Sequence, residues 1–425
     1  MTFLAGTVLL ILFISLGIPI GFALGLAGAT SLAMIVPSPV ILGLMTKLVH
    51  ETAGSYIMVT VPMFILMAEF LSCGGVSQDL LVACNRLMRR VRGGMAMACV
   101  MAGAVLASAS GSSTASAASI TRAAYPVMKR AGYDSSFAIG TISIAGTLAI
   151  MIPPSVALIL YGLMTDASIG KLFLAGVIPG AITAIGYALT ILLILRLKPE
   201  LGAKPEKEAE LAAQSAGGKV WPVGLLIVLV LGGLYSGIAT PTEIGALGAL
   251  FALLISIGTR RMTRPGFVNA IGNTLRTTAM IITIIFSAHL FGYFISFTRV
   301  TDGMLGWITD AQISPTAVML LVVLLYLLMG MIMDQAAIII LTAPITAPLM
   351  VGLGYDVIWW GIVMIKTAEI GLVSPPLGLN VFVASGAAGT DVRTGFRGVL
   401  PFIGTELVIL ALLLAFPQIS LVLTG

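Results

Sequence analysis

The sequence predicts an all-helical protein that crosses a membrane many times and is built from two repeats of opposite orientation. The 425-residue chain is 59% hydrophobic and 9% charged, whereas a soluble domain is about 25% charged. Its mean hydropathy is +1.11, and many apolar runs are long enough to cross about 30 Å of hydrocarbon as helices. The second half of the chain also repeats glycine and proline positions of the first half.

Charge and residue usage exclude several classes of function. The net charge of +5 is scattered over many loops, which favours a role in membrane orientation over a nucleic-acid surface. Cys73, Cys84 and Cys99 lack metal-binding spacing and are interpreted as small packed residues. His50 and His289 stand apart, and no H-E-x-x-H pattern occurs. We therefore expect no enzyme active site, no organic cofactor and no nucleic-acid partner.

The chain begins with predicted scaffold helices. Residues 3–36 form one apolar run that Gly17-Ile18-Pro19 divides into two helices. The start lacks a basic segment and is interpreted as the first spanning helix, not as a cleaved signal. Residues 38–54 are predicted as an interfacial arm, and residues 55–76 cross again. The basic turn at 86–92 then indicates the cytoplasmic side.

Residues 94–128 are predicted to form a re-entrant hairpin. Its small, hydroxyl-rich centre at 107–119 lies midway between the basic turn at 86–92 and Lys129-Arg130. If both basic ends are cytoplasmic, the segment must enter and leave the membrane on one side. The alternative interpretation is a face of small residues that packs against another helix.

A helix broken by two prolines follows. Residues 136–164 are interrupted at Ile152-Pro153-Pro154-Ser155, where two missing N–H groups free carbonyl oxygens in the preceding turn. Such breaks at membrane depth bind ions in transporters, although a proline kink without a ligand is the alternative. Residues 172–195 cross back, and the polar residues 199–219 are predicted as a cytoplasmic linker.

The second half repeats the first with a nearly constant offset. A shift of 222 residues places Pro126 on Pro348 and Pro153-Pro154 on Pro375-Pro376, and a shift of 220 places Gly17 on Gly237. The predicted units are repeat 1 at 1–198 (scaffold 1–76, transport elements 94–164), the linker at 199–219, and repeat 2 at 220–425 (scaffold 220–297, transport elements 313–388).

The repeats are predicted to have opposite orientations. Each has a hairpin that does not cross and an odd number of crossing segments, so the second must be inverted. Arg260-Arg261 indicates a cytoplasmic end, and the second hairpin, at 313–350, has acidic flanks that suit the periplasm. Trp307, Trp359 and Trp360 suit the same interface, and both termini are expected there too.

Two opposed hairpins and two broken helices are typical of secondary transporters with a midplane site. Their hydroxyls, carboxylates and bare carbonyls are hard oxygen ligands that suit Na⁺, with substrate held between two cation sites. The candidate substrate-binding residues are Ser110, Ser112, Ser113, Thr114, Ser116, Asp334, Gln335 and Asn380. The candidate sodium ligands are Ser112, Ser143, Gly146, Pro153, Ser155, Asp334, Glu369, Gly371, Ser374 and Pro375.

Several of these residues have alternative interpretations. Asp334 is either part of an ion site or gate, or the cap of the outgoing hairpin arm. Glu369 is either a coupling carboxylate or a structural partner of Lys366 or another buried donor. Asn380 is interpreted as a substrate or packing amide. Arg122 is interpreted as a cytoplasmic anchor, with a carboxylate contact as the alternative.

The two candidate sites are expected to share backbone geometry and to differ in charge. Ser112 in the first hairpin is equivalent to Asp334 in the second, and Thr147 is equivalent to Glu369. The second half therefore supplies the carboxylates.

Together, five motifs resemble the large membrane (M) subunit of tripartite ATP-independent periplasmic (TRAP) transporters in its unfused form. They lie at 111–118, 152–155, 237–243, 333–335 and 374–382. The resemblance implies Na⁺-driven import of an organic acid, of the sialic acid or C4-dicarboxylate class, through the bacterial inner membrane by an elevator mechanism. It also implies two partners, a small four-helix membrane (Q) subunit and a periplasmic substrate-binding protein.

Three other functions are alternatives to a TRAP permease. A stand-alone Na⁺/dicarboxylate symporter with the same hairpins would transport without partners. An ion channel would need a pore helix, and a membrane-embedded enzyme would need a nucleophile–base pair or metal ligands.

Overall fold

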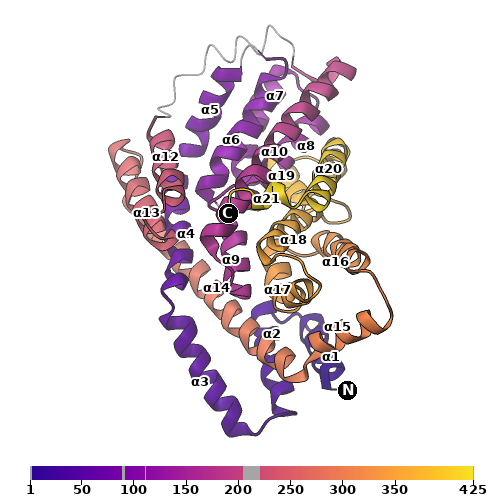
Figure 1. Ribbon diagram of the computed structural model, residues 1–425. Helices are drawn as coiled ribbons and strands as arrows, with labels where there is room; N and C mark the ends of the chain where they lie inside the picture. The colour runs from indigo at the N-terminus through magenta and orange to yellow at the C-terminus, as the bar shows by residue number, and fades with distance from the viewer. Residues whose placement is uncertain (1, 89–90, 111, 204–220, 425) are drawn as a thin grey trace.

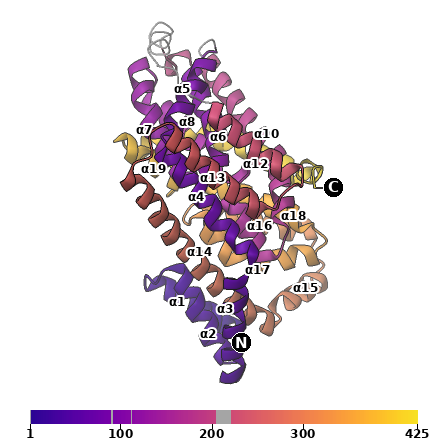
Figure 2. The same ribbon diagram turned by 90° about the vertical axis from the view of Figure 1, so that its left-hand side faces the viewer.

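The computed structural model describes residues 2–88, 91–110, 112–203 and 221–424, and all regular elements in these residues are helices. The molecule is elongated, with α1 to α3 at one end and α5 at the other (Figures 1 and 2). The gap at 204–220 takes in most of the predicted linker, and Gly111 of the first hairpin also lies outside the described residues.

The predicted scaffold consists of helices from both halves of the chain. In the first half these are α1 (Thr2–Ser15), α2 (Ile20–Ala33), α3 (Ser38–Gly54), the 3₁₀ turn η1 (Tyr56–Val59) and α4 (Thr60–Cys73). In the second half they are α12 (Trp221–Tyr235), α13 (Pro241–Gly258) and α14 (Arg264–Thr298), and α15 (Val300–Asp310) follows between the predicted scaffold and the predicted transport elements. The long helix α14 packs along α2, α3 and α4 (Figure 2).

The remaining helices contain the two predicted hairpins and the two broken helices. In the first half they are α5 (Val76–Met88), α6 (Gly94–Ser110), α7 (Ser113–Ala131), α8 (Ser135–Met151), α9 (Val156–Thr165), α10 (Ile169–Leu197) and the 3₁₀ turn η2 (Pro199–Leu201). In the second half they are α16 (Pro315–Gly330), α17 (Gln335–Gly352), α18 (Val357–Gly371), α19 (Leu379–Ala388), α20 (Val392–Ala415) and α21 (Gln418–Leu421).

Helix length and composition agree with a membrane location. Among the described residues, seven helices are long and apolar enough to cross a membrane: Tyr56–Cys73, Ser135–Thr165, Ile169–Leu197, Pro241–Gly258, Arg264–Thr298, Gln335–Gly352 and Val392–Ala415. Shorter apolar helices, including α1, α2 and α16, accompany them. One of the seven, Gln335–Gly352, is the outgoing arm of the second predicted hairpin, so this criterion does not separate re-entrant arms from crossing helices.

Equivalent residues start and stop equivalent helices. Asp134 accepts hydrogen bonds from the first N–H groups of α8 (2.9 and 3.2 Å), and Asp356 does the same for α18 (2.8 and 2.9 Å). Gly132 and Gly354 have φ of 93° and 90°, a left-handed conformation that ends the preceding helix and that glycine adopts without strain. These pairs are each related by the 222-residue shift.

The packing of the helices follows the same relation. α2 packs against α14 while α4 packs against α13, and α7 packs against α19 while α17 packs against α9. In the same way α8 contacts α20 and α10 contacts α18. The repeat shift converts the first contact of each pair into the second. Each of these contacts therefore joins a helix of one half to a helix of the other half.

The centre of the core is formed by α8 and α18. Every residue of α8 from Phe137 to Met151, and every residue of α18 from Ile358 to Gly371, is buried. Trp359 and Trp360 lie within this stretch, and Trp359 Nε1 donates to the Leu413 carbonyl (3.0 Å). The expectation that these two rings face the membrane interface is therefore wrong, whereas Trp307 is exposed.

Candidate functional site

The two hairpin tips have the same local structure. Ser112 is the N-cap of α7 and accepts from Ala115 N (3.5 Å). Asp334, the equivalent residue, is the N-cap of α17 and accepts from Ala336 N (3.1 Å). The capping role that the sequence left open for Asp334 is therefore present, and a carboxylate at this end of a helix is also favoured by the helix dipole.

The first break separates α8 from α9 and is buried. Ser155 caps α9 by accepting from Leu158 N (3.4 Å), and its hydroxyl donates to the Ile150 carbonyl. Pro153 and Pro154 are both buried. The hydroxyl of Ser155 thus replaces, for one carbonyl of the interrupted helix, a donor that the prolines remove.

The second break, between α18 and α19, is more open. Ser374 donates to the Ile370 carbonyl (2.7 Å), and Gly378 precedes α19 with φ of 52°. The backbone N–H of Asn380 donates to the Leu372 carbonyl across the break (3.1 Å). Residues 375–377 are exposed. Both Pro-Pro peptide bonds, Pro153-Pro154 and Pro375-Pro376, are cis.

Asn380 connects the second break to the first hairpin. Its Nδ2 donates to Ser113 Oγ (2.5 Å) and to the Ser143 carbonyl (3.3 Å), so three predicted site residues from α7, α8 and α19 meet. All three are buried, and both Asn380 Oδ1 and Ser143 Oγ lack a hydrogen-bond partner. Because buried polar atoms are normally paired, these two oxygens are candidates for binding a ligand.

Glycines bring backbone segments together at both sites. A Cβ on Gly371 would lie 2.4 Å from Gly330 C, so the ends of α16 and α18 touch. A Cβ on Gly146 would lie 2.9 Å from Ala117 N, which brings α8 against α7 in the same way. Each hairpin therefore lies against the helix that precedes the break in its own half.

The other predicted residues of the tips differ in burial. Gln335 is buried and its Oε1 has no partner, whereas Asp334 is exposed. Ser116 is buried, and Thr114 Oγ1 lies 3.4 Å from Ser112 Oγ. The side chain of Ser110 lies outside the described part of the structure. Arg122 has an exposed side chain on α7.

Glu369 lies in a separate buried cluster. Lys366 Nζ donates to Glu369 Oε2 (3.2 Å) and to Thr183 Oγ1 (2.9 Å), and it lies 2.6 Å from Glu406 Oε2. The partnership with Lys366 that the sequence left open is therefore present. Glu406 and Tyr187 were not among the predicted site residues, although an acidic residue in an apolar helix such as α20 is a signal of a functional or buried polar site.

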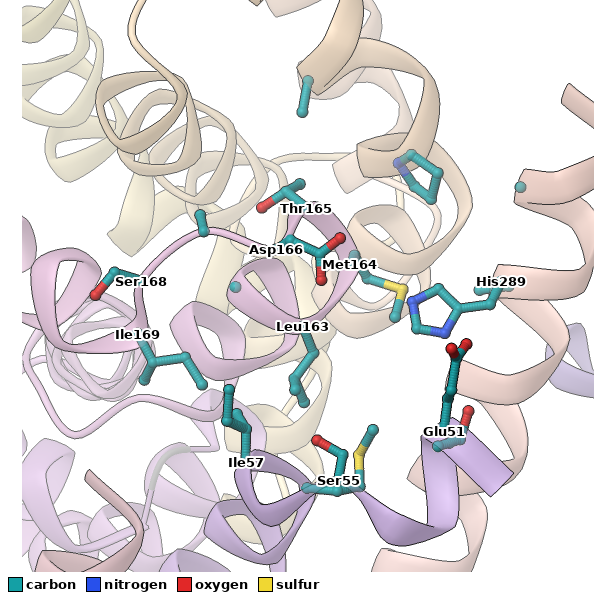
Figure 3. A pocket seen from close by; sticks show the side chains of 18 of the residues that line it. Glu51, Ser55, Ile57, Leu163, Met164, Thr165, Asp166, Ser168, Ile169 and His289 are labelled. Carbon is teal, nitrogen blue, oxygen red and sulfur yellow. The ribbon is translucent and has the colours of Figure 1, made fainter. Parts of the chain in front are cut away.

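A cavity of about 960 Å³ is lined by scaffold helices and by the end of the broken-helix segment α9. Glu51 and Ser55 line it from the scaffold, while Leu163 and Asp166 line it from the end of α9 (Figure 3). His289 of α14 faces the same space as Glu51 (Figure 3). None of the predicted substrate or sodium residues lines this cavity.

Comparisons with known proteins agree on one family. The chain matches the model "Tripartite ATP-independent periplasmic transporter, DctM component" over residues 7–419. It is 36% identical to the C4-dicarboxylate TRAP transporter large permease protein DctM of Pseudomonas aeruginosa, over 94% of this chain and 93% of that protein. It is 27% identical to the sialic acid TRAP transporter large permease protein SiaM of Vibrio cholerae, over 96% and 95%.

A solved structure has a similar fold. The crystal structure of the Alcanivorax borkumensis YdaH transporter superposes with a TM-score of 0.68 over 90% of each chain. The sequences are 18% identical, so this likeness concerns the fold.

Proposed function

The chain belongs to the DctM family of tripartite ATP-independent periplasmic transporters, and we propose that it is a Na⁺-coupled permease that imports an organic acid. Proteins of this family are membrane transporters, not enzymes. The observation that carries the proposal is the junction at Asn380, where the first hairpin tip and both broken helices meet around unpartnered buried oxygens.

We propose two Na⁺ sites, one at each tip-and-break pair. Among the described residues, no group of three or more His, Cys, Asp or Glu side chains is arranged to hold a metal, and in the proposed sites hydroxyls and backbone carbonyls would supply most ligands. The first site would use Ser112, Ser143, Gly146, Pro153 and Ser155, and the second would use Asp334, Gly371, Ser374 and Pro375. We leave Glu369 out of the second set because its carboxylate pairs with Lys366.

The substrate would bind between the two tips. Ser113, Gln335 and Asn380 supply hydroxyl and amide groups, and two bound cations would offset the charge of a carboxylate substrate. We propose the C4-dicarboxylate class, because the relative named for that substrate is 36% identical while the relative named for sialic acid is 27% identical.

An elevator motion fits the division of the molecule. The cavity lies between α3 and α14 on one side and α9 and α17 on the other, although α14 also packs against α9 and α17. The exchanged packing pairs agree with two repeats of inverted orientation. We propose that the helices of the hairpins and breaks move together against the scaffold. Both termini would then be periplasmic.

Two partners complete the proposed system. Apolar side chains such as Leu4 and Val8 of α1 and Leu250 and Leu254 of α13 are exposed on the scaffold, a surface suited to lipid and to the helices of a small Q subunit. A periplasmic binding protein would deliver the substrate. A stand-alone symporter is the alternative, and it predicts uptake without either partner.

Reconstitution tests the proposal. The chain is placed in liposomes with the small membrane protein and the binding protein encoded beside its gene, and uptake of labelled succinate is measured with an inward Na⁺ gradient. We expect accumulation that disappears when K⁺ replaces Na⁺ or when the binding protein is omitted. Uptake that is indifferent to Na⁺ would refute the coupling, and uptake without the binding protein would favour the stand-alone symporter.

A further inference from the structure

Two joints connect the scaffold helices to the helices that precede the hairpins. The first joint (residues 74–76) lies between α4 and α5, and the second joint (residues 298–300) lies between α14 and α15. A shift of 224 residues places Gly75-Val76 on Arg299-Val300. Gly75 and Arg299 both have positive φ, at 65° and 49°. The two joints are therefore equivalent parts of the two repeats, and α5 and α15 lie toward opposite ends of the molecule (Figures 1 and 2).

The first joint is clamped by an arginine from the other half of the chain. Arg261, in the turn between α13 and α14, donates to the carbonyls of Gly74 and Gly75 (3.3 and 3.4 Å). Its two Nη atoms also donate to both carboxylate oxygens of Asp79 on α5 (2.8 and 3.1 Å). Such two-atom pairing fixes orientation as well as distance. One side chain thus holds the joint to the first turn of α5.

Further contacts fix the helix that leads into the first joint. Ser256 Oγ of α13 donates to the Phe70 carbonyl near the end of α4 (2.7 Å). The ring of Phe70 stacks on Phe267 of α14, with 5.8 Å between the ring centroids. Residues 256–267, which we name the α13–α14 corner, therefore hold the end of α4 as well as the joint.

The corresponding corner of the first half is shorter. From Gly28 of α2 to Pro39, the second residue of α3, the chain advances 11 positions. From the equivalent Gly248 of α13 to Pro265, the second residue of α14, it advances 17 positions. Residues 34–38 and 298–302 are all described, and no hydrogen bond or ion pair joins the one segment to the other. The second joint therefore lacks the clamp of the first.

The helices beyond the joints differ in the same direction. α5 packs against α6 and α7, and its buried residues include Leu80, Leu81, Cys84 and Asn85. α15 packs against α14 and α17, but Ile308 is the only buried one of its 11 residues, all of which are described. At the second joint Arg299 is exposed and has a left-handed conformation that is unfavourable for a residue with a Cβ. Few contacts therefore resist a change in the backbone angles of the second joint.

We propose that the moving unit pivots at the first joint and swings at the second, a proposal that rests on the elevator motion proposed above. A body that is clamped at one connection and loosely held at the other rotates about the clamped one. α5 then stays close to its place on the scaffold, while Arg299 and its neighbours absorb the change in backbone angles, as hinge residues do. Arg261 is the positioning residue of the pivot, because it acts on transport only through the joint that it holds.

Distances between pairs of spin labels on the full-length protein, in lipid with both partners, test the pivot. One pair spans the first joint, with labels at the exposed positions Leu87 of α5 and Ile257 of α13. The other pair spans the second joint, at the exposed positions Trp307 of α15 and Leu42 of α3. The three native cysteines are replaced by alanine, and uptake is confirmed for each labelled protein. Adding substrate-loaded binding protein should shift the second distance and leave the first unchanged.

Variants of the corner test the clamp itself. Arg261→Lys retains the charge but loses the two-atom pairing, so the distance across the first joint should spread over a wider range. The initial rate of uptake should fall several-fold. Arg264→Lys, an exposed arginine in the same corner, is the matched control and should change neither quantity.

The other outcomes overturn the proposal at different levels. Equal shifts at both joints, or a larger shift at the first, would refute the pivot and leave the elevator in place. No shift at either joint during normal uptake would refute both. An Arg261→Lys protein that matches the Arg264→Lys control would show that Arg261 is not the clamp. Uptake that is indifferent to Na⁺ would refute the proposed coupling alone, because the distances are compared with and without substrate.

Discussion

Ser112 and Asp334 occupy equivalent positions in the two hairpins, and both cap the outgoing arm, yet only Asp334 carries a charge. The same contrast recurs on the following helices, where Thr147 stands in the first half and Glu369 in the second. The backbone plan is therefore shared, because caps and prolines are found at matching positions, while the carboxylates are concentrated in the second half.

The breaks in the two halves also differ in how much of them is exposed. Pro153 and Ser155 at the first break are buried, whereas residues 375–377 and Asp334 are exposed. Asn380 ties the first tip to the second break, but Gln335, which is equivalent to Ser113, leaves its Oε1 without a partner. The first break is therefore buried by protein contacts, whereas part of the second break and Asp334 are exposed.

The largest expected effect is a difference in uptake between a variant of the charged hairpin tip and a variant of the uncharged one. Asp334→Asn retains a capping side chain and loses the charge, so we expect Na⁺-driven uptake to fall by about tenfold or more, which corresponds to over about 1.4 kcal/mol. Ser112→Ala removes an uncharged cap and should lower uptake only a few-fold. Initial rates in proteoliposomes, with assembly checked by co-purification of the small subunit, measure both. Equal losses in the two variants would contradict the asymmetry of charge.

The next largest effect, on stability, is expected from the close contact between Gly371 and Gly330. Gly371→Ala would place Cβ 2.4 Å from Gly330 C, and forcing these backbones apart should destabilise the protein by about 1–3 kcal/mol. Gly386→Ala is the matched control, because a Cβ there meets nothing within 4 Å. Thermal unfolding in detergent measures both variants. A Gly371→Ala protein as stable as the control would show that the close approach is not required.

Asn380→Ala tests the link between the halves. The variant loses hydrogen bonds to Ser113 and to the Ser143 carbonyl. Its free energy of unfolding should therefore be about 1–3 kcal/mol lower than that of the wild-type protein. Hydrogen exchange should rise at the first hairpin tip and remain unchanged at the second. Faster exchange at both tips would indicate general loosening of the fold.

The smallest expected effect on stability is at Gln335. Because its Oε1 has no partner in the protein, Gln335→Met should change the free energy of unfolding by less than about 1 kcal/mol. If the amide contacts substrate, KM should rise at unchanged protein stability. An unchanged KM would remove Gln335 from the proposed substrate site.

The sequence predicted local features well because their causes are local. Prolines at 153–154 and 375–376 break helices wherever they occur in an apolar run, and the structure has both breaks. The 222-residue shift also matches the N-caps Ser112 and Asp334, since caps depend on residues only a few positions away. Whether the two hairpins are re-entrant stays a prediction.

Contacts between distant segments could not be predicted in the same way. Asn380 and Ser113 are 267 residues apart, and no pattern in either segment specifies the partner. Glu406 was overlooked because a lone acidic residue does not show which helix faces it. Trp359 and Trp360 were misplaced because the usual preference of tryptophan for the interface was overridden by packing within the core.

The dependence of initial uptake rate on Na⁺ concentration, measured with the complete three-part system, tests the central claim most directly. Two Na⁺ sites with a carboxylate in only one predict a sigmoidal curve for the wild-type protein. Ser112→Ala should shift that curve to higher Na⁺, and Asp334→Asn should remove the Na⁺ response. A wild-type rate that does not depend on Na⁺, or identical curves for all three proteins, would contradict the account.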